Sequence, residues 1–145
     1  KERDRSITTE MQKLSKVKKD LRVLIVDDNP INREILSILV DDILQVSAEV
    51  VEDGCEAVER AMKEFYDVIF MDVFMPNLNG LMASEQIIKQ QERNQFAVKS
   101  IIIGVTADYS ISLQEACKRA GMYDCFAKPL DASFVSKKLK ELLCA

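Results

Sequence analysis

Short apolar runs alternate with amphipathic stretches along the chain from residue 21 onward. Most of these runs are rich in β-branched residues, which is typical of strands buried on both faces, and four of the five are followed by Asp, Thr or Lys-Pro. The stretches between them repeat apolar residues every three or four positions, which is typical of helices that pack by one face. The pattern predicts strands at 21–26, 47–51, 67–71, 100–105 and 122–127, and helices at 30–43, 55–64, 81–91, 112–120 and 132–143.

Strands and helices in this alternating order predict the α/β class, with a doubly wound five-stranded parallel sheet and helices on both faces. Asn29 and Pro30 predict the N-cap and the first position of the first helix. Functional groups in such sheets collect at the carboxyl ends of the strands, near the point where the strand order reverses. The residues that follow each strand are therefore the first candidates for a site.

The size and charge of the chain limit its organisation and its partners. With 145 residues, 48% of them hydrophobic, the chain can bury one sizeable core. We predict one domain over 21–145, preceded by an N-terminal helical linker or tail over 1–20, where Ile7, Met11 and Leu14 begin a stripe of helical period. A solvated tail is the alternative.

The net charge of −4 argues against nucleic-acid binding, and no apolar run is long enough to suggest membrane contact.

Cysteine and histidine usage excludes several kinds of site. The chain has no histidine and its four cysteines form no C-x-x-C pair, so neither a zinc site nor a Ser-His-Asp or Cys-His catalytic pair is expected. No glycine-rich nucleotide-binding motif is present. We predict reduced, partly buried thiols at Cys55, Cys117, Cys125 and Cys144.

Three acids, one hydroxyl and one amine follow the predicted strands. Asp27 and Asp28 end the first strand and Asp72 the third, while Thr106 and Lys128 follow the fourth and fifth. Carboxylates this close cannot all stay ionised unaided, and Mg²⁺ relieves the repulsion because it binds carboxylate and phosphate oxygens. Asp72 could then attack phosphorus, with Lys128 and Thr106 binding phosphoryl oxygens. Each residue alone is compatible with a turn or capping role, but their joint placement favours a site.

The segments VLIVDDN, DVIFMDVFMPNLNG, VTAD and FAKPL make most of the chain resemble the receiver domain of two-component response regulators. The resemblance implies a flavodoxin-like fold with strand order 2-1-3-4-5. It also implies that Asp72 is the phosphoacceptor. Mg²⁺ would be bound by Asp27, Asp28, Asp72 and the backbone carbonyl of Phe74.

The same resemblance assigns roles to the residues after the last two strands. Thr106 would be the switch hydroxyl, and Lys128 would bind the phosphate. The Lys128–Pro129 peptide bond would be cis, which is inexpensive only before proline. Ala107 is small and would leave room for phosphodonors.

Three further positions modify the expected behaviour. Phe74 could shield the acyl phosphate from water, and Asp108 could orient or repel such a water, so we expect a phosphoryl lifetime of minutes or longer. Cys125 stands three residues before Lys128, where the family often has an aromatic residue. The usual coupling of the threonine to an aromatic side chain is therefore in doubt. A redox role for Cys125 is disfavoured because no basic neighbour is evident.

The segments DDNPINREIL, EDGCEAVE and FMDVFMPNLNG resemble receivers attached to hybrid histidine kinases. This resemblance implies a histidine kinase, a histidine phosphotransfer protein, or both as partners. It favours a C-terminal receiver cut from such a kinase, in the cytoplasm or in the cytosolic part of a membrane-bound sensor. A standalone receiver is the alternative. The chain itself would be no enzyme beyond accepting its own phosphoryl group and slowly losing it.

Two other functions compete with a phosphoacceptor switch. An aspartate-nucleophile phosphohydrolase of the haloacid dehalogenase type would carry its nucleophile after the first strand in a D-x-D pattern, but Asn29 replaces the second acid here. A phosphate-independent binding domain would keep the fold without the chemistry. The retained set of three acids, threonine and lysine argues against that loss.

Overall fold

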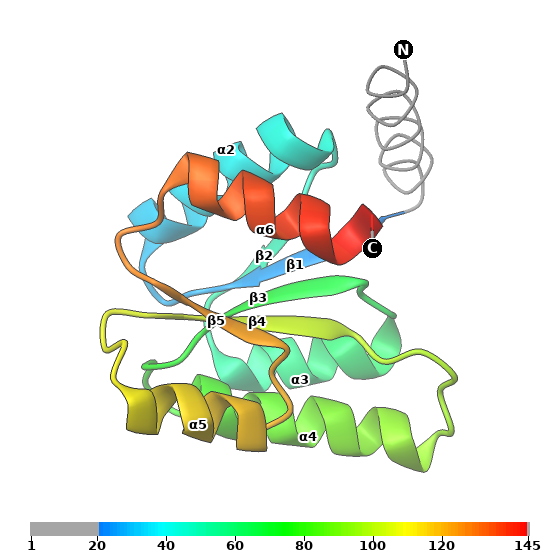
Figure 1. Ribbon diagram of the computed structural model, residues 1–145. Coiled ribbons are helices and arrows are strands. Elements are labelled where there is room, and N and C mark those ends of the chain that lie inside the picture. The colour runs from blue at the N-terminus through cyan, green and yellow to red at the C-terminus, as the bar shows by residue number, and fades with distance from the viewer. Residues whose placement is uncertain (1–20, 145) are drawn as a thin grey trace.

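The computed structural model describes residues 21–144 as a three-layer α/β sandwich (Figure 1). A five-stranded parallel sheet in the order β2-β1-β3-β4-β5 confirms the predicted fold class and strand order. Helices α2 and α6 cover one face of the sheet, and α3, α4 and α5 cover the other. The helical linker predicted over 1–20 lies outside the described residues.

The described strands and helices agree with the predicted elements in kind and order. Their ends differ by up to two residues; β5, for example, begins at Asp124 because the Met122 N–H still donates to the Cys117 carbonyl at the end of α5. The strands are β1 Val23–Val26, β2 Glu49–Val51, β3 Val68–Asp72, β4 Ile101–Thr106 and β5 Asp124–Ala127. The helices are α2 Pro30–Leu44, α3 Gly54–Lys63, α4 Gly80–Arg93, α5 Ile111–Arg119 and α6 Ala132–Cys144.

Side-chain caps fix where the helices begin, at the edge where the strands end. Asn29 caps α2 as predicted: its side-chain oxygen accepts from the Ile31 N–H at 2.8 Å, with Pro30 at the first helical position. Asp53, Asn79 and Ser110 cap the next three helices in the same way. Such caps satisfy backbone donors that have no partner within the helix.

Two apolar cores lie on opposite faces of the sheet, as the alternation of side chains along a strand requires. Ile25 and Phe70 belong to the core under α2 and α6. Leu24 and Ile69, one position earlier on the same strands, belong to the core under α3, α4 and α5. Full burial of such a side chain contributes about 1.5–3 kcal/mol, so the ends of β1 and β3 are held from both sides.

Gly80 lets the start of α4 approach the end of β3. Its N–H donates to the Val73 carbonyl at 2.9 Å. A Cβ at this position would collide with the backbone oxygen of Asp72. The glycine therefore supports the backbone that carries the site.

Over residues 21–144, no helix is both long and apolar enough to cross a bilayer.

Candidate functional site

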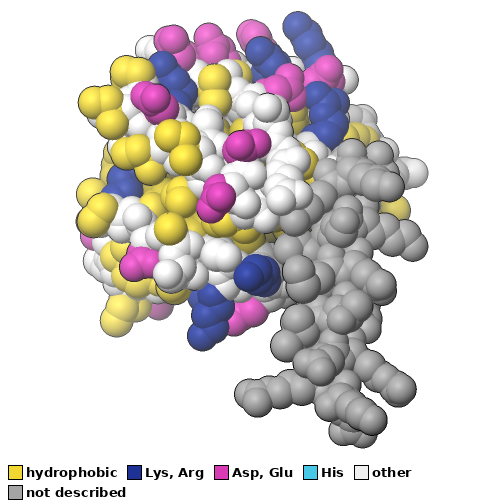
Figure 2. Space-filling view, turned by 90° about the horizontal axis from the view of Figure 1, so that it is seen from above, with side chains coloured by type: hydrophobic (Ala, Val, Ile, Leu, Met, Phe, Trp, Pro, Cys, Tyr) yellow, Lys and Arg dark blue, Asp and Glu magenta, His cyan; other side chains and the backbone are white. Residues whose placement is uncertain are grey.

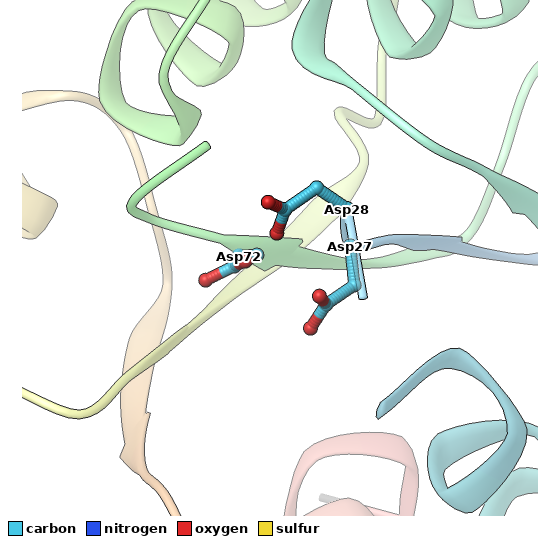
Figure 3. Close-up of side chains that lie close together, drawn as sticks. All are labelled: Asp27, Asp28 and Asp72. Atoms are coloured by element: carbon cyan, nitrogen blue, oxygen red, sulfur yellow. The ribbon is translucent and has the colours of Figure 1, made fainter. Parts of the chain in front are cut away.

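Three aspartates meet at the carboxyl edge of the sheet. Asp27 and Asp28 directly follow β1, and Asp72 is the last residue of β3, which pairs with β1 in parallel. One carboxylate oxygen from each of the three lies within 4.8 Å of the others. Figure 3 shows the three side chains around a common space beyond the strand ends. Strand pairing thus brings together acids that are 44 positions or more apart in sequence, from Asp28 to Asp72.

Burial and like charge dominate the electrostatics of this cluster. Asp27 is only 1% exposed and Asp72 4%, whereas Asp28 is exposed. The Lys128 ammonium lies 3.2 Å from Asp72 Oδ1 and 3.4 Å from Asp27 Oδ2. Burial, followed by the charge of Asp27, raises the pKa of Asp72 to about 7, although Lys128 opposes the change. A single ammonium therefore does not compensate the buried carboxylates.

Besides the contact with Lys128, three hydrogen bonds hold Asp27. The Asn29 N–H donates to its Oδ1 at 2.9 Å, and its own N–H donates to the Val51 carbonyl at 3.3 Å. The Arg33 guanidinium, one turn into α2, donates to its backbone oxygen at 2.8 Å. The predicted site did not include Arg33, because a lone arginine on a helix carries no signal of the strand end it contacts.

The hydroxyl of Thr106 is engaged with the loop after β4. Thr106 is fully buried; its Oγ1 accepts from the Asp108 N–H at 3.0 Å and donates to the Asp108 backbone oxygen at 3.2 Å. Thr106 ends β4, the strand that pairs with β3 and so lies next to Asp72, as predicted. Its hydroxyl, however, bonds to Asp108 in the loop after β4. Ala107 and the Asp108 side chain are exposed.

The remaining predicted site residues, Phe74, Lys128 and Pro129, follow β3 and β5. The Lys128 N–H donates to the Thr106 carbonyl at 2.8 Å, and the Lys128–Pro129 bond is cis, as the resemblance implied. Phe74 lies two residues after β3 and is 58% exposed, so its ring lies at the solvent-exposed rim of the site, beyond the end of β3. The role of its backbone carbonyl stays a prediction.

A cavity of about 400 Å³ opens beside Asp27 and Lys128. It has the volume of a small-molecule pocket and lies between α2, the end of β4 and the connection from β5 to α6. Its remaining lining is Asn32, Ile35, Leu36, Val105, Ala107, Pro129 and Leu130.

Residues 23–140 match the response regulator receiver domain family. The chain belongs to this family. Among curated proteins, it is 33% identical over 122 residues to hybrid signal transduction histidine kinase F of Dictyostelium discoideum, covering 84% of this chain and 11% of that protein. It is 37% identical over 111 residues to the histidine-protein kinase BarA of Escherichia coli, covering 77% of this chain and 12% of BarA. The receiver thus spans about an eighth of these relatives or less.

Two solved structures extend the comparison. The Ssk1 receiver domain of Saccharomyces cerevisiae, crystallised with the histidine phosphotransfer protein Ypd1, has a TM-score of 0.79 and 32% identity, covering 86% of this chain and 89% of that one. The receiver domain of a Pseudomonas aeruginosa sensor histidine kinase, crystallised with magnesium in its active-site cleft, has a TM-score of 0.72 and 29% identity, covering 86% and 97%. The protein is therefore a receiver domain of two-component signalling.

Proposed function

We propose that this receiver is a phosphoacceptor switch in which Asp72 takes a phosphoryl group from a phosphohistidine. An Asp72 carboxylate oxygen attacks phosphorus, the P–N bond of the donor breaks, and its electron pair returns to the imidazole. The products are an aspartyl phosphate on this chain and an unphosphorylated histidine side chain on the donor. The observation that carries the proposal is the buried Asp72 carboxylate, 3.2 Å from the Lys128 ammonium and grouped with Asp27 and Asp28.

The acidic cluster fits Mg²⁺. Its donors are carboxylate oxygens, the ligands this hard cation prefers. Burial and the charge of Asp27 raise the pKa of Asp72 even though Lys128 opposes the change, so the carboxylates are not fully compensated by this one ammonium. Asp27, Asp28 and Asp72 would hold the ion, and the receiver of the Pseudomonas kinase, crystallised with magnesium in its cleft, supports this assignment. Bound there, Mg²⁺ supplies positive charge for the carboxylates and the phosphoryl oxygens.

The remaining residues act on the phosphoryl group and on its lifetime. Lys128 balances the added negative charge from its present position near Asp72. Thr106 donates its hydroxyl to a phosphoryl oxygen after exchanging its bonds with Asp108. Phe74 shields the acyl phosphate at the rim, and Asp108 orients or repels water there. The chain catalyses only its own phosphorylation and slow dephosphorylation.

The partner we infer is a histidine kinase or a histidine phosphotransfer protein. Ile31, Ile35 and Ile38 of α2 repeat at helical spacing and are between 47% and 65% exposed. Figure 2, which looks onto the side covered by α2 and α6, shows hydrophobic side chains gathered there. Ile35 also lines the cavity beside Lys128, so a helix packed on this stripe would bring its histidine to the site. The complex of the Ssk1 receiver with Ypd1 supports this class of partner.

The similarity to hybrid kinases favours a receiver that is part of such a kinase, with a standalone receiver as the alternative. In either case we place its action in the cytoplasm.

Phosphorylation of the purified chain tests the mechanism. The protein is incubated with acetyl phosphate and Mg²⁺, and its intact mass is measured beside Asp72→Asn and the control Asp42→Asn, an exposed position on α2. We expect the mass of one phosphoryl group in the wild type and the control, dependent on Mg²⁺, and none in Asp72→Asn. Absence of both phosphorylation and beryllofluoride binding in the wild type would favour a phosphate-independent domain.

Transfer to a histidine phosphotransfer protein such as Ypd1 tests the docking surface separately. Ile38→Asp places a charge on the exposed α2 stripe, and Met62→Asp places one on the equally exposed surface of α3. Only Ile38→Asp should slow transfer, while labelling by acetyl phosphate stays normal in both. Equal transfer rates in the two variants would exclude the α2 stripe as the contact.

A further inference from the structure

Two free thiols meet inside the core, away from the phosphoacceptor site. Cys117 on α5 and Cys125 on β5 are buried, with exposed fractions of 1% and 4%, and their sulfur atoms lie 3.7 Å apart. Sequence spacing did not suggest this pair, because eight positions and a change from helix to strand separate the two residues. Cys55, by contrast, is exposed on α3; the prediction that it is partly buried was wrong.

The connection between α5 and β5 holds the two sulfurs together. The N–H groups of Gly121 and Met122 donate to the carbonyls of Lys118 and Cys117, each at 3.0 Å. Gly121 has a φ of +93°, which a glycine adopts without strain and which turns the chain back toward the sheet. The Tyr123 N–H then donates to the Ile102 carbonyl at 2.7 Å and starts β5 alongside β4. The thiol contact is therefore a product of a short, hydrogen-bonded connection.

The sequence disfavoured a redox role for Cys125 because no basic neighbour was evident, but the structure supplies a second thiol as its neighbour. We propose that Cys117 and Cys125 form an oxidation site, at which a hydroperoxide converts the two thiols into a disulfide that ties α5 to β5. The first sulfur attacks a peroxide oxygen, the O–O bond breaks, and a sulfenic acid and water form when the peroxide is hydrogen peroxide. The second sulfur attacks the sulfenic sulfur and releases a second water. Two thiol hydrogens and two electrons leave the protein, and one S–S bond forms.

The closed core restrains this reaction and makes it depend on motion of α5. Burial raises the pKa of the Cys117 thiol, and burial together with the neighbouring Cys117 raises that of Cys125 to about 12. The reactive thiolate is therefore scarce while the pair is closed. Oxidation therefore requires a transient opening of α5, a helix of nine residues, that would admit water and peroxide. On closure the sulfurs need to approach from 3.7 Å to the bond length of about 2.05 Å.

The disulfide would restrain a strand that leads to the phosphoacceptor site. Cys125 lies on β5 three residues before Lys128, whose ammonium contacts Asp27 and Asp72. The exposed Tyr123 lies between the two cysteines in sequence, so the surface over this connection also loses freedom. Oxidation would thus restrain one segment that carries the exposed Tyr123 and leads into the site residue Lys128.

The oxidation experiment uses the full chain with Cys55 and Cys144 changed to serine, so that a disulfide within one molecule can join only Cys117 and Cys125. The folded protein is treated with hydrogen peroxide, unfolded, alkylated and mapped by mass spectrometry. We expect a loss of two hydrogens, one peptide pair linked through Cys117 and Cys125, and no alkylation of either. Amide exchange over residues 117–125 should slow about tenfold or more, because the cross-link removes open states of a short loop.

Two single-cysteine variants and the chemical form of the oxidised thiols test the proposal. Added to that chain, Cys117→Ala and Cys125→Ala should each abolish the loss of two hydrogens, with folding checked by circular dichroism. If either variant fails to fold, the map of the chain that keeps both Cys117 and Cys125 decides alone. Sulfinic acid on one cysteine without the disulfide, links only between molecules, or a disulfide only under denaturing conditions would each overturn it. Acetyl phosphate labelling of the same sample reports Asp72 separately, so loss of one activity is not mistaken for loss of the other.

Discussion

Replacing Asp72, the proposed phosphoacceptor, by its amide should stabilise the metal-free protein at neutral and alkaline pH. The pKa of Asp72 is about 7 in the folded chain, against an ordinary value of 3.8. One pKa unit corresponds to about 1.4 kcal/mol, so ionised Asp72 costs the folded state on the order of 4 kcal/mol. Asp72→Asn removes this net cost, in which the opposing attraction of Lys128 is already counted. We therefore expect a net gain of about 2–4 kcal/mol at about pH 8.

The pH dependence follows from the direction of the pKa change. Between the unfolded and folded pKa values of Asp72, the folded chain holds a proton that the unfolded chain has released. The free energy of unfolding therefore falls as the pH rises from about 4 to about 7, and the full cost of the charge is present above that window. The advantage of Asp72→Asn should be near zero at the low end and largest at the high end.

Urea denaturation in the presence of a chelator, followed by circular dichroism across this pH range, measures the difference. The exposed Asp42→Asn changes the net charge equally and should alter stability by less than about 0.5 kcal/mol. A destabilised Asp72→Asn at high pH, or a gain that does not vary with pH, would refute the reasoning from burial and repulsion.

Three further perturbations test the site and the backbone that supports it. Mg²⁺ at about a hundred times its dissociation constant should raise the stability of the wild type by about 2.7 kcal/mol through linkage, and less in Asp27→Asn; urea midpoints that do not move with Mg²⁺ would contradict the metal site. Gly80→Ala should lower stability by about 2–4 kcal/mol, because its Cβ collides with the Asp72 backbone oxygen; an unchanged urea midpoint would show that α4 shifts without cost. Phe74→Ala should shorten the phosphoryl lifetime several-fold, as followed by loss of phosphoryl mass in Mg²⁺, and an unchanged lifetime would exclude shielding by the ring.

The hydrophobic pattern by itself determined the elements, their order and the residues at the strand ends. Continuous apolar strands alternating with amphipathic helices allow a parallel sheet with both faces covered, and a parallel sheet places all its carboxyl ends at one edge. Asp27, Asp72 and Lys128 could therefore be grouped before any distance was known. Asn29 and Pro30 marked the start of α2 because capping depends on neighbours in sequence.

Tertiary structure alone decided which atoms touch. Three contacts show this, because each joins two elements or an element and a loop. They are the hydrogen bond from Arg33 to the Asp27 carbonyl, the bonds of the Thr106 hydroxyl with the loop after β4, and the contact of Cys117 with Cys125. Such contacts depend on strand register, helix rotation and side-chain direction, which a hydrophobic pattern does not specify. The raised pKa of Asp72 belongs to the same class, since burial and the approach of Asp27 exist only once the sheet has formed. The sequence determined the chemistry available at the sheet edge, and packing determined the distances through which that chemistry acts.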